Sequence, residues 1–315
     1  MLIVFARVLS IFLLTFLGYF ACKIKILPAE SKKYLINLML YITAPCMAGA
    51  SIYQKELTDT VLSATKQVLI GAAIFFIICL IIALLVVKVF KFPKKDWGIY
   101  ITAVTCINTG FMGFPVTKAI FGEDIFYLMV MHNIIACIFI YGIAPILLDT
   151  SSDSSPKGSK LSSLKLMVNP CTVGIVIGVV MLLLGIKPPE TIDSVIMSLA
   201  DATVPISMII VGIQLAGSNL KEILKDKQIC IINVVSMIII PILTFLVVDQ
   251  FDMINPKVKL LLIFASVFPT AVAPAAIAEQ RGVPSNKLAE IVSVTTATSM
   301  IVIPLMAIIL MSKYM

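Results

Sequence analysis

Ten runs of apolar residues, each about 20 residues long, constrain this chain more than any other feature, because each can cross a bilayer as a helix. We number them spans 1 to 10, and they cover residues 3–22, 34–53, 67–90, 98–120, 124–148, 166–185, 194–217, 228–249, 257–279 and 288–311. Charged residues make up only 13% of the chain, whereas a soluble domain carries about 25%. The sequence therefore predicts an all-α polytopic membrane protein with ten transmembrane helices.

The charges between the spans predict how the chain is oriented. Most of the 24 lysines and arginines lie in the loops that follow odd-numbered spans. Short cytoplasmic loops carry an excess of these residues. We therefore expect a multi-pass protein of the cell membrane with both termini outside. The basic residues are dispersed among many loops, so they do not indicate nucleic-acid binding.

A serine-rich segment at 149–165 predicts a flexible cytoplasmic linker between two halves of the chain. The halves, 1–148 and 166–315, contain five spans each. Because five is odd, the second half enters the membrane in the opposite orientation, as in an inverted-topology repeat. Three features recur in equivalent spans at offsets of 159 or 160 residues: Thr43–Pro45 with Thr203–Pro205, Gly18 with Gly178, and Pro115 with Pro274. We therefore predict two inverted five-helix repeats.

Span 4 is interrupted in its middle by the segment 108–115, Asn-Thr-Gly-Phe-Met-Gly-Phe-Pro. Its two glycines and its proline weaken a helix, and its first two residues offer polar groups where lipid offers none. Irregular backbone inside a bilayer is tolerated only where protein buries it or where it lines a wet cavity. The segment therefore marks a candidate binding site, made of Asn108, Thr109, Gly110, Gly113 and Pro115.

Span 9 carries a matching interruption at 268–274, Phe-Pro-Thr-Ala-Val-Ala-Pro, whose two prolines disfavour a continuous helix. Both interruptions lie at the centre of their spans, so we expect them near the bilayer midplane. Each second half-helix begins near a proline, Pro115 or Pro274, and proline is favoured in the first helical turn. The candidate binding residues of span 9 are Pro269, Thr270, Ala271 and Pro274.

Two half-helix N-termini that meet inside a membrane can bind an anion without an arginine, because their N–H groups and dipoles point to the same place. An ordinary proline kink is the structural alternative for either interruption taken alone. The pairing of two interruptions at equivalent positions favours a binding site over two unrelated kinks.

The motif at 108–115, the ten spans and the proline-rich span 9 together resemble the auxin efflux carrier family of membrane transporters, which extends to prokaryotes. The resemblance covers essentially the whole chain, and the family is similar in fold to the bile acid:sodium symporters. It implies that spans 4 and 9 cross at their interruptions, in a transport domain of spans 3–5 and 8–10 that moves as an elevator. It also implies a scaffold of spans 1, 2, 6 and 7 that forms a homodimer contact.

The resemblance further implies a small organic anion as the substrate. The long hydrophilic loop of the plant hormone exporters is reduced here to the linker, so we expect a small carboxylate in place of auxin. The scaffold residues expected to face the crossing are Thr43, Pro45, Thr203 and Pro205. The two threonines have an alternative role, because a hydroxyl group can satisfy a carbonyl freed near a proline.

Three polar residues within the spans are candidates for coupling transport to an ion. Asp201 lies in the middle of span 7, and a carboxylate at membrane depth indicates a function such as proton exchange. Its alternative is a structural aspartate bonded to a neighbouring threonine. His132 and Asn133 lie in span 5 and form either part of a proton relay or satisfied structural side chains.

Glu279 and Gln280 end span 9 and directly precede Arg281. One interpretation is a solvated helix end with a local ion pair. The other rests on the resemblance to the sodium symporters, and it places these residues in a Na⁺ site with Asn108 and Asn133 as further oxygen ligands. The seven cysteines lack CxxC spacing, so we expect neither a disulfide framework nor a bound transition metal.

The predicted function is secondary active or facilitative transport, as an exporter of small organic anions. The alternatives are a sodium-coupled symporter, a passive channel or a non-transporting receptor on the same fold. An intramembrane enzyme needs paired carboxylates, a histidine cluster or an activated nucleophile, and the spans offer Asp201 alone. The chain contains no P-loop, and we expect no cofactor. The expected partners are the substrate anion, membrane lipid, H⁺ or Na⁺, and a second copy of the chain.

Overall fold

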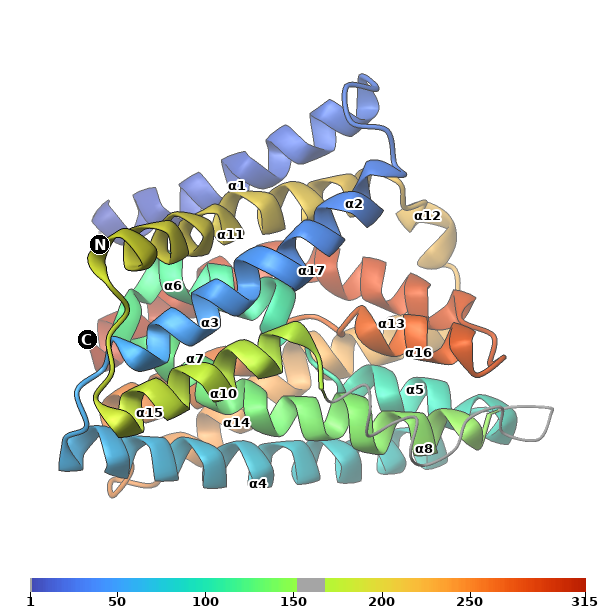
Figure 1. Cartoon of the computed structure of the whole chain (residues 1–315). Coiled ribbons are helices and arrows are strands. Elements are labelled where there is room, and N and C mark those ends of the chain that lie inside the picture. The colour runs from blue at the N-terminus through green and yellow to red at the C-terminus, as the bar shows by residue number, and fades with distance from the viewer. Residues whose placement is uncertain (1, 152–167) are drawn as a thin grey trace. The chain divides into compact units, whose positions relative to one another are not determined.

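The computed structural model describes residues 2–151 and 168–315, apart from the side chains of residues 2–5 and 8. In these ranges the regular structure is helical (Figure 1), and one isolated β-bridge is the only extended pairing. Residues 152–165 of the predicted linker lie outside the described part.

Six of the described helices are long and apolar enough to cross a membrane, which confirms the all-α membrane class. They are Ser31–Tyr53, Asp59–Val89, Glu123–Asp149, Glu190–Ala216, Lys227–Asp249 and Asn286–Tyr314. Spans 1 and 6 correspond to the shorter apolar helices Leu9–Lys23 and Pro170–Leu184. The arrangement as two inverted repeats of five spans stays a prediction.

The chain folds into two compact units, each assembled from segments that are distant in the sequence. Unit 1 consists of Met1–Val68, Gly110–Met131 and Val168–Gly217, and unit 2 of Leu69–Thr109, His132–Met167 and Ser218–Met315. At three of its five passages between the units the chain is inside a helical element: after Val68 within α4, after Thr109 within η3 and after Met131 within α7. The passage after Gly217 lies between α11 and α12. The predicted division into scaffold and transport domains stays a prediction.

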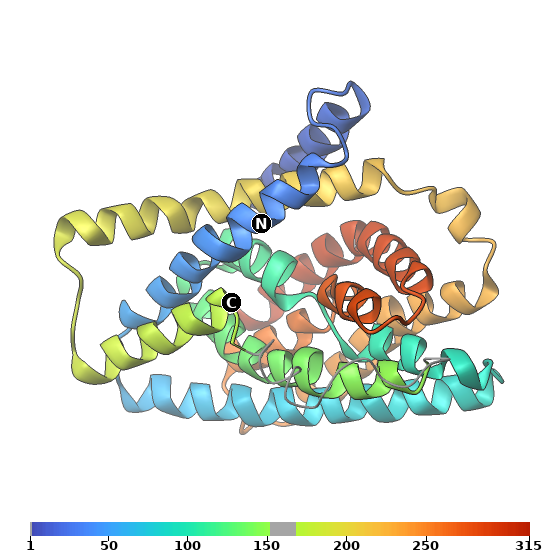
Figure 2. The same ribbon diagram turned by 45° about the vertical axis from the view of Figure 1, so that its right-hand side comes forward.

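Unit 1 contains two pairs of closely packed helices. Its helices are α1 (Leu2–Lys23), α2 (Ser31–Leu38), α3 (Ala44–Tyr53), α6 (Phe114–Phe121), α10 (Pro170–Leu184) and α11 (Glu190–Ala216). Helix α1 runs along α11, and α3 runs along α10 (Figures 1 and 2). Glycine permits both contacts: a β-carbon on Gly212 would lie 2.1 Å from the carbonyl oxygen of Thr15, and one on Gly174 would lie 2.5 Å from that of Pro45. Small residues at such crossings allow membrane helices to pack backbone to backbone.

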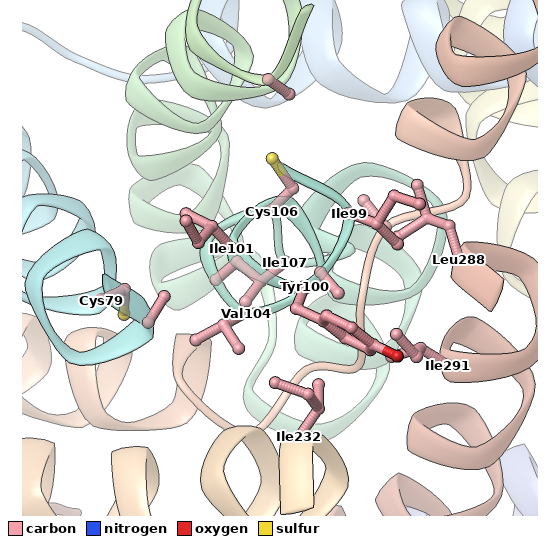
Figure 3. Packing of buried hydrophobic residues seen from close by; sticks show 14 of the residues in the cluster. Cys79, Ile99, Tyr100, Ile101, Val104, Cys106, Ile107, Ile232, Leu288 and Ile291 are labelled. Atoms are coloured by element: carbon pink, nitrogen blue, oxygen red, sulfur yellow. The ribbon is translucent and has the colours of Figure 1, made fainter. Parts of the chain in front are cut away.

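Unit 2 is organised around two short helices that are buried on all sides. Its helical elements are η2 (Lys94–Asp96), α5 (Trp97–Thr105), α8 (Ala144–Asp149), α12 (Leu220–Ile223), α13 (Lys227–Val234), α14 (Ile240–Asp249), α15 (Pro256–Ala265), α16 (Ala273–Gln280) and α17 (Asn286–Tyr314), with parts of α4 (Asp59–Val89) and α7 (Glu123–Cys137). Every residue of α5 from Gly98 onward and every residue of α15 from Val258 onward is buried. In Figure 3 the ring of Tyr100 points from α5 toward Ile232 of α13 and Ile291 of α17. A helix that is apolar all round needs protein on every side, and unit 2 supplies it.

Four π-helical turns occur in the described residues, and each ends two residues before a proline. They are η1 (Met39–Thr43) before Pro45, η3 (Thr109–Gly113) before Pro115, η4 (Ile138–Ile143) before Pro145, and η5 (Val235–Ile239) before Pro241. Proline lacks an N–H group, and its ring collides with the carbonyl four residues earlier in an α-helix. A wider preceding turn accommodates the ring. Pro205 is different, because it lies inside α11 without a π-turn.

Candidate functional site

The two interruptions predicted from the sequence lie side by side in unit 2. Helix α5 ends at Thr105, and the gap between α15 and α16 runs from residue 266 to 272. In these gaps Ile107 and Thr270 form the isolated antiparallel β-bridge. The N–H of Asn108 donates to the carbonyl of Pro269, and the N–H of Ala271 donates to the carbonyl of Cys106, each at 2.7 Å. The two interruptions therefore satisfy part of each other's freed backbone, which leaves fewer N–H groups for a ligand than the sequence suggested.

Thr270 is held at the crossing by its side chain and by its backbone. Its hydroxyl donates to the carbonyl of Ala103 in α5 at 2.8 Å. Its N–H donates to the hydroxyl oxygen of Thr295 in α17 at 3.2 Å, and that hydroxyl donates in turn to the carbonyl of Ile291 at 2.8 Å. Both threonines are buried. Thr295 therefore positions the second interruption, a role that the sequence interpretation missed.

Thr109 makes the corresponding contact at the first interruption. Its hydroxyl donates to the side-chain oxygen of Asn133 in α7 at 2.6 Å, and the Asn133 amide approaches the sulfur of Cys137 at 3.5 Å. The two residues are 24 positions apart, and Thr270 and Thr295 are 25 apart. This similar spacing, with a difference of one residue, is the signal that identifies Thr295. The Asn133 oxygen, a candidate ion ligand, thus accepts a structural hydrogen bond. Asn108, which precedes Thr109 in the chain, is buried.

The remaining part of the first motif belongs to unit 1. Gly110 and Gly113 lie in η3, which runs directly into α6, so this half-helix begins at Thr109 and Pro115 lies inside it, unlike the predicted start near Pro115. Pro274 lies in the first turn of α16, within unit 2, as predicted for a half-helix start. Inside unit 1 the hydroxyl of Ser207 in α11 donates to the carbonyl of Phe111 in η3, four residues before Pro115, which has no N–H to donate to it. Ser207 was not predicted, although it lies one turn after the candidate Thr203 on the same face of its helix.

The other scaffold candidates are buried in unit 1. Thr43 ends η1 and Thr203 lies inside α11, and neither hydroxyl has a hydrogen-bond partner among the described atoms. The expected bond to a freed carbonyl is therefore absent from the described contacts of both residues. Pro45 stands in the first turn of α3, and Pro205 lies within α11.

Asp201 is exposed, whereas its position in an apolar span suggested burial. Its side chain is 66% exposed and lies 3.1 Å from the ammonium of Lys118 in α6. The same ammonium lies 3.1 Å from the carboxylate of Glu123. The partner of Asp201 is thus a lysine, and the predicted bond to a neighbouring threonine is not what holds it.

His132 is fully buried in unit 2 beside the rings of Phe75 and Phe76, at centroid distances of 6.0 and 5.4 Å. Neither ring nitrogen has a hydrogen-bond partner among the described residues. The sequence interpretation offered a satisfied structural histidine or a relay member, and the described contacts are instead those of an aromatic ring in an apolar packing site.

Glu279 and Gln280 are exposed at the last turn of α16, at the end of that helix opposite to the crossing. Arg281 lies against α8, where its guanidinium is 2.5 Å from the carboxylate of Asp149. In the part of the chain that the structure describes, no group of three or more His, Cys, Asp or Glu side chains is placed to hold a metal ion.

Comparison with known proteins identifies a family whose members match nearly the whole chain. The family model described as membrane transport protein matches residues 3–307. An uncharacterized transporter of Methanocaldococcus jannaschii is 26% identical over 315 residues, covering 97% of this chain and 98% of that protein. A second uncharacterized transporter, of Methanothermobacter thermautotrophicus, is 23% identical over 313 residues, covering 96% of this chain and 97% of that protein.

The family match extends over nearly the whole chain and includes both interruptions. It confirms the resemblance drawn from the motif at 108–115. This chain is a member of the membrane transport protein family, the auxin efflux carrier-like transporters.

Proposed function

We propose that this protein is a secondary active or facilitative transporter that exports small organic anions, such as carboxylates, across the cell membrane. The observation that carries the proposal is the buried crossing in unit 2, where two interrupted helices pair at Ile107 and Thr270. Such backbone is stable inside a bilayer only when protein or a wet cavity surrounds it.

The chemistry of the crossing suits an anion bound by neutral donors. The gaps 106–108 and 266–272 contain no charged residue, but they carry the side-chain amide of Asn108. Helix α16 begins two residues after Ala271, so the positive end of its dipole lies next to the bridge. A carboxylate is the common biological anion that such donors can bind without a full counter-charge.

The finer features of the proposal follow from the family. They comprise ten spans in two inverted repeats, both termini outside, a homodimer through spans 1, 2, 6 and 7, and elevator-type movement of spans 3–5 and 8–10. For the coupling ion we favour H⁺ or none over Na⁺, because Glu279 lies at the end of α16 opposite to the crossing, away from Asn133, and the Asn133 oxygen already accepts a hydrogen bond from Thr109.

Transport in proteoliposomes tests the proposal. The purified protein is reconstituted, and uptake and counterflow of labelled mono- and dicarboxylates are measured with and without proton and sodium gradients. We expect saturable counterflow of at least one small carboxylate. Absence of saturable flux across the panel in folded, reconstituted protein would contradict the proposed function.

The variants Asn108→Ala and Asn108→Asp connect that flux to the crossing. The first variant removes an amide donor. The second replaces the amide by a negatively charged side chain of nearly the same size, which repels an anion. Both should therefore abolish flux. Ser312→Ala is the matched control, since Ser312 is exposed near the end of α17 and bonds only within its own helix. Wild-type flux in both Asn108 variants would remove the crossing from the binding site.

A further inference from the structure

The hairpin formed by α6 and the first two turns of α7, residues 114–131, belongs to unit 1. Polar contacts at three places attach it to the rest of that unit. The ammonium of Lys118 pairs with Asp201 of α11 at 3.1 Å. The ammonium of Lys55, just after α3, pairs with Asp124 at 2.5 Å. The guanidinium of Arg7 in α1 donates to the carbonyl of Ile120 at 3.1 Å. Three separate helices of unit 1 thus hold one hairpin.

Each of the two ammonium groups also has an aromatic ring of the same hairpin beside it. Lys118 lies 5.9 Å from the ring centre of Phe126, and Lys55 lies 5.8 Å from that of Tyr127. A cation within about 6 Å of an aromatic face is attracted to it. The tyrosine hydroxyl is in turn 2.9 Å from that of Thr65 in α4. The hairpin and its surroundings therefore form a specific set of contacts around two cations.

The burial of the ion pairs is asymmetric. The side chains of Lys118 and Lys55 are only 14% and 19% exposed, whereas Asp201 and Asp124 are 66% and 58% exposed. The protein therefore covers the cation of each pair and leaves the carboxylate outside. Opening either pair does not leave a carboxylate buried in the protein, and Lys118 keeps a second partner, Glu123, at 3.1 Å.

The hairpin is also joined directly to the candidate binding site. Lys118 stands three residues after Pro115, on the half-helix whose preceding residues are the interruption of span 4. Residues 110–131 continue into unit 2 at both ends without a linker, at Thr109 within η3 and at His132 within α7. The hairpin is therefore continuous along the chain with Thr109 on one side and with Asn133 on the other.

We propose that Lys118–Asp201 and Lys55–Asp124 form an ionic clasp that positions the hairpin 114–131 and opens and closes once in each transport cycle. Asp201 then acts as a positioning residue, and it need not exchange a proton with the substrate path. The cycle itself rests on the proposed function, but the clasp can be measured without any substrate.

Hydrogen–deuterium exchange of the full-length protein in lipid nanodiscs tests the clasp. In a Glu123→Gln background, which removes the second carboxylate 3.1 Å from Lys118, Lys118→Glu and Asp201→Lys each place like charges at one pair, and the double variant K118E/D201K restores opposite charges in the reversed order. We expect each single variant to raise deuterium uptake of residues 114–131 about fivefold, and the double variant to return it close to wild type. Lys225→Glu is the matched control, because the exposed Lys225–Glu222 pair lies in unit 2 and should leave the hairpin unchanged.

Unchanged uptake in both single variants would overturn the clasp. So would raised uptake that persists in the double variant, because that outcome indicates lost packing and not lost pairing. If a charge reversal prevents folding, Lys118→Gln and Asp201→Asn remove the attraction without repulsion and are judged by the same criteria. Where a transported carboxylate is known, the single variants should change the turnover rate and leave KM within about twofold. Absence of flux, together with deuterium uptake of residues 114–131 that depends on the charges at 118 and 201, would contradict the proposed function and still support the clasp.

Discussion

The hydroxyl of Thr109 donates a hydrogen bond of 2.6 Å to the side-chain oxygen of Asn133, and through it the first helix interruption is held by the helix that follows. The second interruption is held in the same way, by Thr270 and Thr295. In both cases a threonine of the interruption donates to a side chain of the next long helix, from its hydroxyl at Thr109 and from its backbone N–H at Thr270. These two hydrogen bonds fix the position of each interruption against a neighbouring helix.

Thr109→Val should destabilise the protein, because it leaves the buried oxygen of Asn133 without this donor. Hydrogen bonds between membrane helices contribute modestly, so we expect a loss of about 1 kcal/mol and a lower unfolding temperature in detergent. The double variant T109V/N133L removes both partners and should lose less than the sum of the two single variants. Strict additivity in that cycle would show that the bond contributes nothing to stability.

Thr295→Val should impair the second interruption, because the buried N–H of Thr270 loses its acceptor. An unpaired buried polar group costs about 1–3 kcal/mol, so the unfolding temperature should fall. Thr295→Ser keeps the hydroxyl and should behave like wild type. Thr298→Val is the control in the same helix, since the Thr298 hydroxyl bonds only to the carbonyl of Val294. Equal effects of the two valine variants would contradict the positioning role of Thr295.

Gly212→Val should separate α1 from α11, because a β-carbon at this position would lie 2.1 Å from the carbonyl oxygen of Thr15. Overpacking of this kind costs about 1–3 kcal/mol. Gly142→Ala is the matched control, since a β-carbon there meets nothing within 4 Å. The prediction is checked by thermal unfolding of both variants, and a Gly212 variant as stable as the Gly142 variant would refute the close packing of α1 on α11.

His132→Phe should stabilise unit 2, because the histidine ring packs against Phe75 and Phe76 and neither of its nitrogens is bonded to a described residue. Replacing a buried polar ring without partners by an apolar ring of similar shape should gain about 1 kcal/mol in unfolding free energy. The pH profile of transport should keep its shape. A flattened profile with intact folding would instead assign His132 to a proton relay.

Several features of this protein could be predicted because their causes are local in the chain. The apolar runs identify a membrane protein, and the prolines and glycines at 108–115 and 268–274 indicate which two spans are interrupted, since a missing N–H or a missing β-carbon acts within about one turn. In span 4 the break itself lies at 106–108, just before these residues, which are helical. The π-turns before Pro45, Pro115, Pro145 and Pro241 have the same local origin.

Contacts between distant segments could not be predicted in this way. Asp201 appeared to be a buried acid, but the position of α6 exposes it and pairs it with Lys118, 83 residues away. Ser207 and Thr295 look like ordinary hydroxyl residues in apolar helices until Phe111 and Thr270 are placed beside them.

The sequence by itself determined which two spans of this protein are interrupted, because propensity and steric exclusion operate between neighbouring residues. Only the tertiary structure decided which groups the breaks meet: Asn108 and Ala271 pair with Pro269 and Cys106 across more than half the chain. A freed N–H or carbonyl in an apolar interior must find a partner, and the choice of partner depends on which segments the packing of buried helices brings within 3 Å.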